Sequence, residues 1–226
     1  FTDMENVIIN GNVSSILVNG NFKRSADYKL PGVPFDYSYK NTVSPFTLSN
    51  CKKLVLKNFK IDGGVMQMTR DKNVVEGFCY GISISDYLPT HNSGDILIDS
   101  VLVQHFATDG LFLRGAGKNF QVKNSTFKNN GRQGFSMVRG RDVLVYNSNF
   151  DSTGFVGKYQ GHSPQAWIDV DNEYKLEDLT NIKIAKSNFR HNNGFQFVST
   201  SASGSVSLDS CFFADLTNGY GNGFNG

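Results

Sequence analysis

One pattern of hydrophobic and polar residues recurs along the chain, at a spacing of 23 or 24 residues where no insertion separates the copies. Apolar residues at alternate positions indicate a strand with one buried face, and a polar pair before the next apolar residue indicates a turn into a second strand. Four segments superimpose without gaps, apolar at positions one, three and eight: 120–127, 143–150, 182–189 and 206–213. Their eighth residues are Phe127, Phe150, Phe189 and Phe213.

Further copies extend the pattern toward the N-terminus. Residues 54–61 and 96–103 fit the same frame, and residues 7–11 form a partial copy. Between the copies lies another short strand, usually opened by glycine, at 81–85, 110–114, 134–138, 166–171 and 194–198. Insertions at about 64–79, 86–94 and 154–164 lengthen some of the units.

A unit of about 23 residues that holds short strands and no helix is typical of one coil of a parallel β-helix. Equivalent positions of stacked coils lie about 4.8 Å apart, so the four phenylalanines are expected to form an internal stack. Asn58, Asn124 and Asn147 share one turn position, where their amides are expected to hydrogen-bond along the axis. A leucine-rich repeat lacks support because its repeated Leu and Asn signature is absent, and a β-sandwich would show frequent hairpin turns instead.

Composition agrees with an all-β fold. Seven Ala and four Glu stand against 24 Asn, 23 Gly and 19 Phe, which excludes a helical bundle. A net charge of +2 argues against a nucleic-acid partner, and the absence of an apolar run of about 18 residues argues against a membrane span. The chain begins at Phe1 and ends in a Gly-rich segment, so residues 1–226 are expected to be one β-helix domain cut from a longer chain, without one or both end caps.

Outward positions of the glycine-opened strands are where a groove is expected. Strand alternation places two columns of side chains on the outer face: Ser83, Phe112, Ser136, Asp169 and Gln196, then Ser85, Arg114, Val138, Asp171 and Val198. Just before these strands lie Asp109, Arg132, Gln133 and Gln165. A groove of carboxylates, amides, arginine and aromatic rings, walled by the insertions, suits an extended and acidic glycan.

Asp169 and Asp171 are the principal catalytic candidates. They lie two residues apart, so both carboxylates project from one face of a strand. Such a pair suits a glycosidase, as acid and base or as acid and nucleophile. With Glu173 it would equally suit Ca²⁺, and the sequence indicates no other cofactor. The plain alternative is that both residues solvate the face of a sheet.

The remaining candidates have a functional and a structural interpretation each. Asp109 is either a further catalytic carboxylate or a turn residue before Gly110. Arg132 and Arg114 would bind an acidic sugar through a bidentate fork, an arginine would be the base in a lyase, and both are otherwise surface charges. The expected substrate-binding residues are Gln133, Gln165, Arg114, Ser136, Phe112, Tyr159 and His162.

Residues 131–138 (GRQGFSMV), followed one coil later by 163–171 (SPQAWIDVD), resemble the pectate-lyase-like right-handed β-helix superfamily. This superfamily contains polysaccharide lyases, glycoside hydrolases, uronan epimerases and phage tailspikes. The resemblance implies a single-stranded right-handed solenoid of about 7–8 coils, located outside the cell, at its surface or on a virion. Residues 107–110 (ATDG) resemble the Asn-Thr-Asp element of polygalacturonases, but Ala107 replaces the Asn, so that chemistry is not expected here.

Three functions remain open from the sequence. The first is an enzyme, either a polysaccharide lyase or a glycoside hydrolase, that cleaves or modifies an acidic polysaccharide. The second is a non-catalytic glycan-binding tailspike or adhesin segment, for which a homotrimer is expected. The third is a purely structural solenoid.

Overall fold

A computed structural model describes residues 1–18, 44–64, 80–156, 159–160, 164–171, 178–199, 204–214 and 224–225. These residues form strands and no helix. The strands are β1 (Glu5–Leu17), β2 (Phe46–Leu48), β3 (Lys52–Asp62), β4 (Ile82–Ser85), β5 (Gly94–Gln104), β6 (Asp109–Lys123), β7 (Thr126–Lys128), β8 (Gln133–Tyr146), β9 (Asn149–Asp151), β10 (Phe155–Val156), β11 (Tyr159–Gln160), β12 (Ile168–Val170), β13 (Leu179–Ala185), β14 (Asn188–Arg190), β15 (Phe197–Ser199), β16 (Val206–Asp209), β17 (Phe212–Phe213) and β18 (Phe224–Asn225).

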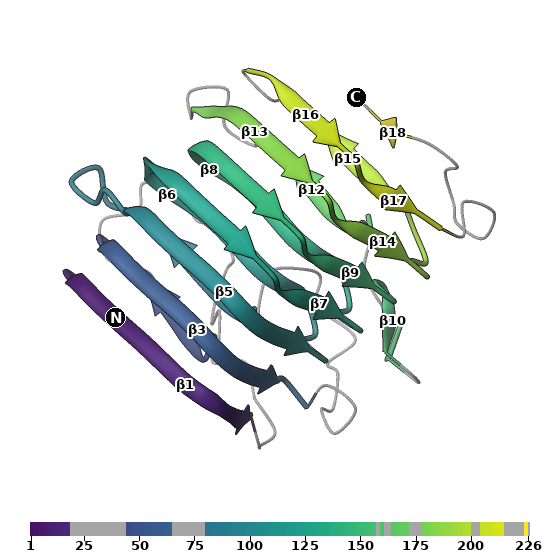
Figure 1. Ribbon diagram of the computed structural model, residues 1–226, viewed down its shortest axis with the longest axis horizontal. Coiled ribbons are helices and arrows are strands. Elements are labelled where there is room, and N and C mark those ends of the chain that lie inside the picture. Colours follow the sequence, from purple (N-terminus) through teal and green to yellow (C-terminus); the bar gives the residue numbers. More distant parts are fainter. Residues whose placement is uncertain are drawn as a thin grey trace, which may run out of the picture.

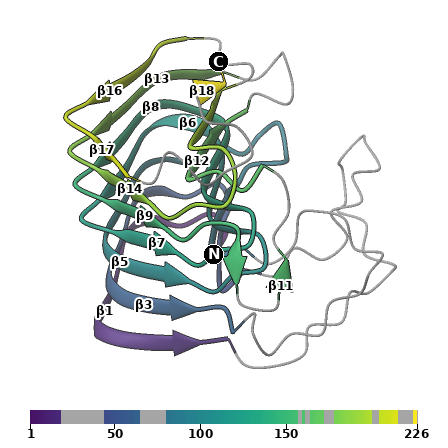
Figure 2. The ribbon, with the colours of Figure 1, turned by 90° about the vertical axis from the view of Figure 1, so that its right-hand side faces the viewer.

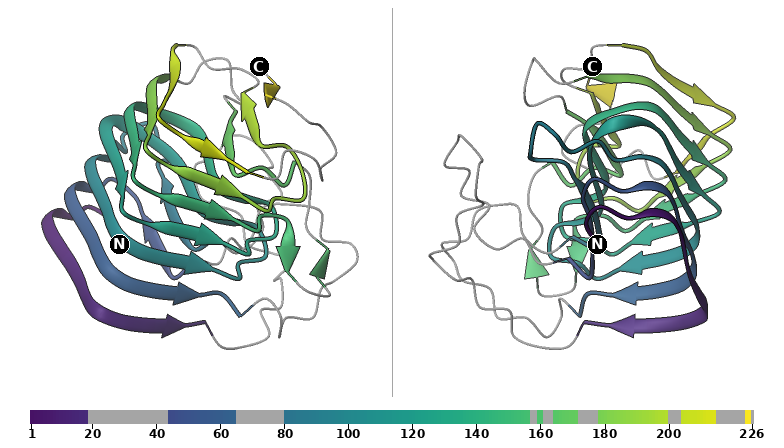
Figure 3. Two further views of the ribbon diagram at one scale, coloured as in Figure 1. Left: turned by 45° about the vertical axis from the view of Figure 1, so that its right-hand side comes forward. Right: turned by 90° about the vertical axis from the view of Figure 1, so that its left-hand side faces the viewer.

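The strands stack as successive turns of a solenoid (Figures 1 and 2). One face follows the order β1–β3–β5–β6–β8–β13–β16, a second follows β5–β7–β9–β14–β17, and a third follows β2–β4–β6–β8–β12–β15–β18. Pairing within these faces is parallel, whereas β10 and β11 form an antiparallel pair. β6 and β8 are long enough to bend from the third face into the first, as Figure 3 shows. The parallel β-helix predicted from the repeat is confirmed, including the partial copy near the N-terminus, where Val7 pairs with Leu54.

The predicted phenylalanine stack is confirmed. Phe127, Phe150, Phe189 and Phe213 occupy equivalent positions of neighbouring coils. Their ring centroids are separated by 5.3, 5.2 and 4.7 Å along the stack, with the rings nearly parallel. Trp167 is fully buried at one side of this stack, tilted against Phe189 and Phe213. The indole nitrogen of Trp167 donates a hydrogen bond of 2.9 Å to the carbonyl of Arg190, so its one polar group is satisfied.

A column of buried serines runs beside the phenylalanines. The hydroxyl of Ser148 accepts the backbone N–H of Ser125 at 3.3 Å and donates to the carbonyl of Tyr146 at 3.0 Å. The hydroxyl of Ser187 repeats this arrangement, since it accepts from the backbone of Ser148 and donates to that of Ala185. The turn between adjacent strands leaves these backbone groups without ladder partners, and the serines supply them.

Each coil turns this corner at a residue in the left-handed backbone region. The residues are Asn58, Ser100, Asn124, Asn147, Lys186 and Ser210, with φ between 48° and 58°. Asparagine tolerates this conformation well, which accounts for its abundance here. The predicted amide ladder is confirmed between Asn147 and Asn124, at 2.7 Å. It does not reach Asn58, because the intervening coil carries Ser100, and Asn58 instead donates to Asn10 at 3.1 Å.

Glycines open the strands of the third face because the chain passes closely over the phenylalanine stack. A Cβ on Gly134 would lie 2.6 Å from the Phe150 ring and 2.6 Å from the carbonyl oxygen of Trp167. Real side chains do not approach so closely, so only glycine fits.

The expected alignment of the last glycine-opened segment is wrong by two residues. Asp169 pairs with Val198 instead of Gln196, and Ile168 pairs with Phe197. A shift of two residues keeps the same side chains facing inward, so the alternation of apolar residues cannot detect it.

Candidate active site

Four polar side chains gather on the outer side of the third face, and we call them the Asp169 cluster: Asp109, Arg132, Gln133 and Asp169. Asp109 begins β6 and Gln133 begins β8, opposite one another in the sheet. Asp169 lies in the middle of β12, between Ile168 and Val170, which both belong to the core. Alternation therefore turns the Asp169 side chain outward, as predicted.

The outward-facing residues next to the cluster are buried, which the sequence did not indicate. Asp169 is only 7% exposed, and Ser136 and Phe112, which follow it in register across the sheet, are also buried. Phe112 stacks on Tyr80, with a centroid separation of 4.7 Å. The interpretation of Asp169 as a solvated residue on a sheet face is therefore wrong.

Arg132 and Asp109 form a bidentate ion pair. The guanidinium donates from Nε to Oδ1 of Asp109 at 2.8 Å and from Nη2 to Oδ2 at 2.6 Å. The Asp109 side chain is fully buried. Burial acts to lower the pKa of Arg132, but the charge and hydrogen bonds of Asp109 outweigh it and hold that pKa well above its usual range. Arg132 is therefore a permanent cation at this site, and Asp109 is more than a turn residue.

Gln133 joins Asp169 to this pair. Its side-chain Nε2 donates to Oδ2 of Asp169. Two oxygen atoms here are buried without a hydrogen-bond partner, namely Oδ1 of Asp169 and Oε1 of Gln133. Unsatisfied buried oxygens are uncommon in folded proteins and mark a place where a proton or a ligand would be stabilised.

The pKa of Asp169 is raised to about 7. Burial is the largest cause, because it disfavours the charged carboxylate. The nearby charge of Arg132 opposes it, and the negative charges of Asp171 and Asp109 reinforce it. Two closely spaced carboxylates repel, so one of them keeps its proton to higher pH, and the effect of Asp171 on Asp169 has that direction, although the effect of burial is larger. Asp169 is thus a carboxyl group that exchanges its proton near neutral pH.

The other candidates lie around the cluster. Asp171 follows β12 and is half-buried, and its backbone N–H donates to the carbonyl of Met137 at 2.9 Å. Gln165 is half-buried and accepts a hydrogen bond of 3.1 Å from Asn193. Arg114 lies over the ring of Tyr87, with 4.6 Å between its Cζ and the ring centroid. Arg114 pairs with Arg139, beside a β-bulge, so the expected second column does not align Arg114 with Val138.

Three predicted residues cannot be placed at the site. His162 and Glu173 lie outside the described residues, and Tyr159 is described only as part of strand β11. Within the described ranges, no three His, Cys, Asp or Glu side chains lie together in a way that would hold a metal ion. Tyr80 also lies near the cluster, since its ring stacks on Phe112 and its charge contributes to the raised pKa of Arg132. Sequence reasoning did not select it, because it stands in a segment without a repeat signal.

Comparisons with known proteins give the family of this fold. No curated protein matches the chain. A solved structure with 13% sequence identity and a TM-score of 0.49 is tailspike protein gp49 from Acinetobacter baumannii bacteriophage Fri1, a capsular polysaccharide depolymerase. The similarity covers 80% of this chain but 38% of that one, so the chain spans well under half of that protein's length.

A search of the described residues for a helix long and apolar enough to cross a membrane found none. The family model of the right-handed β-helix region matches residues 90–225, more than half of the chain. With parallel strands wound into stacked coils, the chain belongs to the right-handed β-helix family.

Proposed function

We propose that this protein hydrolyses glycosidic bonds in an extended acidic polysaccharide, with Asp169 as the general acid. The observation that carries the proposal is the state of Asp169, a buried outward-facing carboxyl with one unbonded oxygen and a pKa of about 7. A general acid works best when its pKa lies near the pH of the reaction.

The chemistry needs two carboxyl groups. Asp169, protonated below about pH 7, gives its proton to the glycosidic oxygen while the bond from that oxygen to the anomeric carbon breaks. Asp171, on the same side of the chain, either takes a proton from the attacking water or attacks the anomeric carbon and forms a glycosyl ester. In the first case, solvent then restores the proton to Asp169 and removes the one held by Asp171. In the second case, the Asp169 carboxylate takes a proton from water, which cleaves the ester, frees Asp171 and leaves Asp169 protonated again.

Arg132 favours hydrolysis over elimination. Arginine would have to be deprotonated to remove a proton from the sugar in a lyase, and Asp109 keeps the guanidinium of Arg132 protonated. The role suggested for Arg132 is to hold Asp109 and to place a positive charge beside an acidic sugar. Gln165, at the adjoining strand entrance, would help to orient that sugar.

A panel of acidic and neutral polysaccharides, assayed for products and for binding, tests the proposal. Hydrolysis yields new reducing ends without ultraviolet absorbance, whereas a lyase yields unsaturated products that absorb. Asp169→Asn is expected to lower turnover by several orders of magnitude without loss of folding, while Asp209→Asn, on the first face, leaves turnover unchanged. Full turnover in Asp169→Asn would refute the proposal.

Non-catalytic glycan binding is the second candidate, favoured by the small exposed fraction of Asp169 and by the complete engagement of Asp109 with Arg132. In this case, the panel would show binding without products, and Asp169→Asn would weaken affinity. If Ca²⁺ takes part through Asp169 and Asp171, EDTA would abolish binding and Ca²⁺ would restore it. A tailspike role on a virion further implies a homotrimer, which light scattering would detect.

A further inference from the structure

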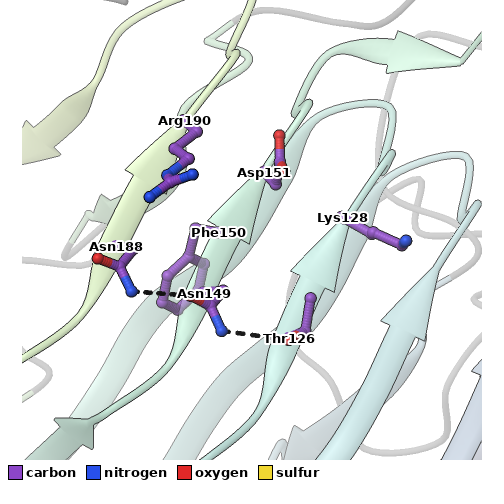
Figure 4. Close-up of a pocket in the computed structure, with 7 residues that line it drawn as sticks. All are labelled: Thr126, Lys128, Asn149, Phe150, Asp151, Asn188 and Arg190. Carbon is purple, nitrogen blue, oxygen red and sulfur yellow. Dashed lines mark hydrogen bonds between the residues drawn. The ribbon is translucent and has the colours of Figure 1, made fainter. Parts of the chain in front are cut away.

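A second polar surface lies on a different face of the solenoid from the Asp169 cluster. It covers β7, β9 and β14 and contains a shallow cavity of about 310 Å³ (Figure 4). The cavity is lined by Thr126, Lys128, Asn149, Phe150, Asp151, Asn188 and Arg190. Because the three strands pair in register, the outward side chains form two rows across them, a neutral row and a charged row.

The neutral row consists of Thr126, Asn149 and Asn188. The amide of Asn188 donates to Oδ1 of Asn149 at 2.9 Å, and the amide of Asn149 points to the Thr126 hydroxyl at 3.5 Å. These contacts fix the orientation of both amides and leave the Asn188 carbonyl oxygen and the Thr126 hydroxyl hydrogen for a ligand. Such a row of oriented donors and acceptors suits the hydroxyl groups of a saccharide.

The charged row consists of Lys128, Asp151 and Arg190. Asp151 lies between the two cations in register, but its Oδ1 contacts Nδ1 of His191 at 2.9 Å and accepts from the Ser152 hydroxyl at 2.9 Å. In the part of the chain that the structure describes, neither the Lys128 ammonium nor the Arg190 guanidinium has an ion-pair partner. Two cations without a carboxylate partner favour an anionic ligand.

Phe212 extends the surface by one coil. It pairs with Asn188 in register and is 52% exposed. The Arg190 guanidinium lies over its ring, with 5.3 Å from Cζ to the centroid, which holds the guanidinium at the edge of the cavity. An exposed ring beside oriented amides is a surface on which the apolar face of a sugar stacks.

We propose that the surface formed by Thr126, Lys128, Asn149, Asn188, Arg190 and Phe212 is a second saccharide site that binds uronate oligosaccharides. Lys128 and Arg190 would bind the carboxylates, the amide row would bind the hydroxyls, and Phe212 would contact a ring face. A polyanion such as nucleic acid is less well matched, because the surface offers two cations and the chain carries a net charge of only +2. This site is independent of the chemistry proposed for Asp169.

Calorimetry with oligosaccharides of galacturonate, glucuronate and mannuronate tests the proposal, using the Asp169→Asn variant so that turnover does not interfere. Binding of at least one uronate is expected, together with loss of that binding when its carboxylates are methyl-esterified. Lys128→Gln and Arg190→Gln are each expected to weaken the affinity roughly tenfold, as is typical for the loss of one charge-assisted hydrogen bond. Lys118→Gln, an exposed lysine of β6, is the matched control and is expected to bind normally.

The proposal is overturned if no uronate binds, or if the Lys128→Gln/Arg190→Gln double variant binds as tightly as the parent with an unchanged unfolding midpoint. It is also overturned if light scattering shows self-association that this double variant abolishes while uronate affinity stays the same, because the surface would then be a contact between copies. Turnover of the parent on polysaccharide tests the proposal for Asp169 separately, and the Lys128→Gln/Arg190→Gln variant tests only the second site, so the two proposals fail separately.

Discussion

The guanidinium of Arg132 holds both carboxylate oxygens of Asp109, and the two residues lie at the entrances of neighbouring strands. The Asp109 side chain is fully buried and that of Arg132 is only 11% exposed, so water can do little to replace the partner of either charge. Asp169 lies close enough to this pair for both of its charges to affect the Asp169 carboxyl. The ion pair therefore has a structural and an electrostatic consequence, and the two can be separated by mutation.

Breaking the pair from one side is expected to be costly. Arg132→Gln leaves Asp109 buried without a counter-charge and should lower the free energy of unfolding by about 3–5 kcal/mol. The Asp109→Asn/Arg132→Gln double variant should lose less than the sum of the single variants, since neither charge remains. Denaturant unfolding of all four proteins gives the coupling energy, with Lys53→Gln, from the exposed pair with Glu5, as a control expected within about 1 kcal/mol of the parent. Strict additivity would show that the two residues act independently.

The raised pKa of Asp169 predicts a specific dependence of stability on pH. The folded state holds this proton up to about pH 7, while the unfolded chain releases it near 3.8. Between these values the native state binds more protons, so the contribution of Asp169 to stability is complete below pH 3.8 and is lost as the pH rises through 7. The change in the free energy of unfolding caused by Asp169→Asn should therefore be more favourable at pH 8 than at pH 4, by on the order of 4 kcal/mol. Unfolding curves at both pH values provide the measurement, and a pH-independent difference would show that the carboxyl is ionised throughout.

Hydrolysis by Asp169 has its own pH signature. If Asp169 is the general acid, kcat/KM should fall tenfold per pH unit above about 7, because the proton it donates is lost. Asp171→Asn removes a negative charge that raises the pKa of Asp169, so the decrease in any remaining kcat/KM should begin at a lower pH in this variant. A decrease that begins at the same pH as in the parent would contradict the electrostatic link between the two carboxyl groups.

The phenylalanine stack should dominate the stability of the central coils. Phe150 contacts rings on both sides and is fully buried, so Phe150→Ala should lower the free energy of unfolding by roughly 3–5 kcal/mol. Phe150→Leu, which retains much of the volume, should lose less. Equal losses in the two variants would indicate that ring stacking matters more than filled volume.

The buried serines can be tested in the same way. Ser148→Ala removes the acceptor for the Ser125 N–H and the donor to the Tyr146 carbonyl, and should cost about 1–3 kcal/mol. Ser207→Ala, an exposed residue of β16, is the control and should be near neutral. A neutral Ser148→Ala would mean that the backbone groups find other partners.

Much of the fold could be predicted from the sequence because the repeated residues form the core. Phe127, Phe150 and Phe189 each close a copy of the repeated segment, and stacking identical residues is the simplest way for equal coils to pack. The offset of Phe197 was missed, because a shift by two residues preserves the alternation that reveals strands.

The site was less predictable. Alternation placed Asp169 outward, but its burial, the Gln133 contact and the position of Tyr80 leave no periodic signal. The surface around Asn149 and Arg190 was overlooked for another reason. Thr126, Asn149 and Asn188 lie in the repeated segments, whose polar positions predict only a turn, and Lys128 and Arg190 directly follow those segments.

Trp167 makes the core stack and the candidate active site observable in one experiment. It is the only tryptophan of the chain, it is fully buried against Phe189 and Phe213, and it lies two residues before Asp169. Its fluorescence emission should therefore be blue-shifted in the folded protein and move to the red when the stack opens. Ionisation of Asp169 changes the local field without unfolding the coil, so a smaller spectral change centred near pH 7 should appear in the parent and vanish in Asp169→Asn. The fluorescence of Trp167 therefore reports the protonation of Asp169, on which the proposed catalysis depends.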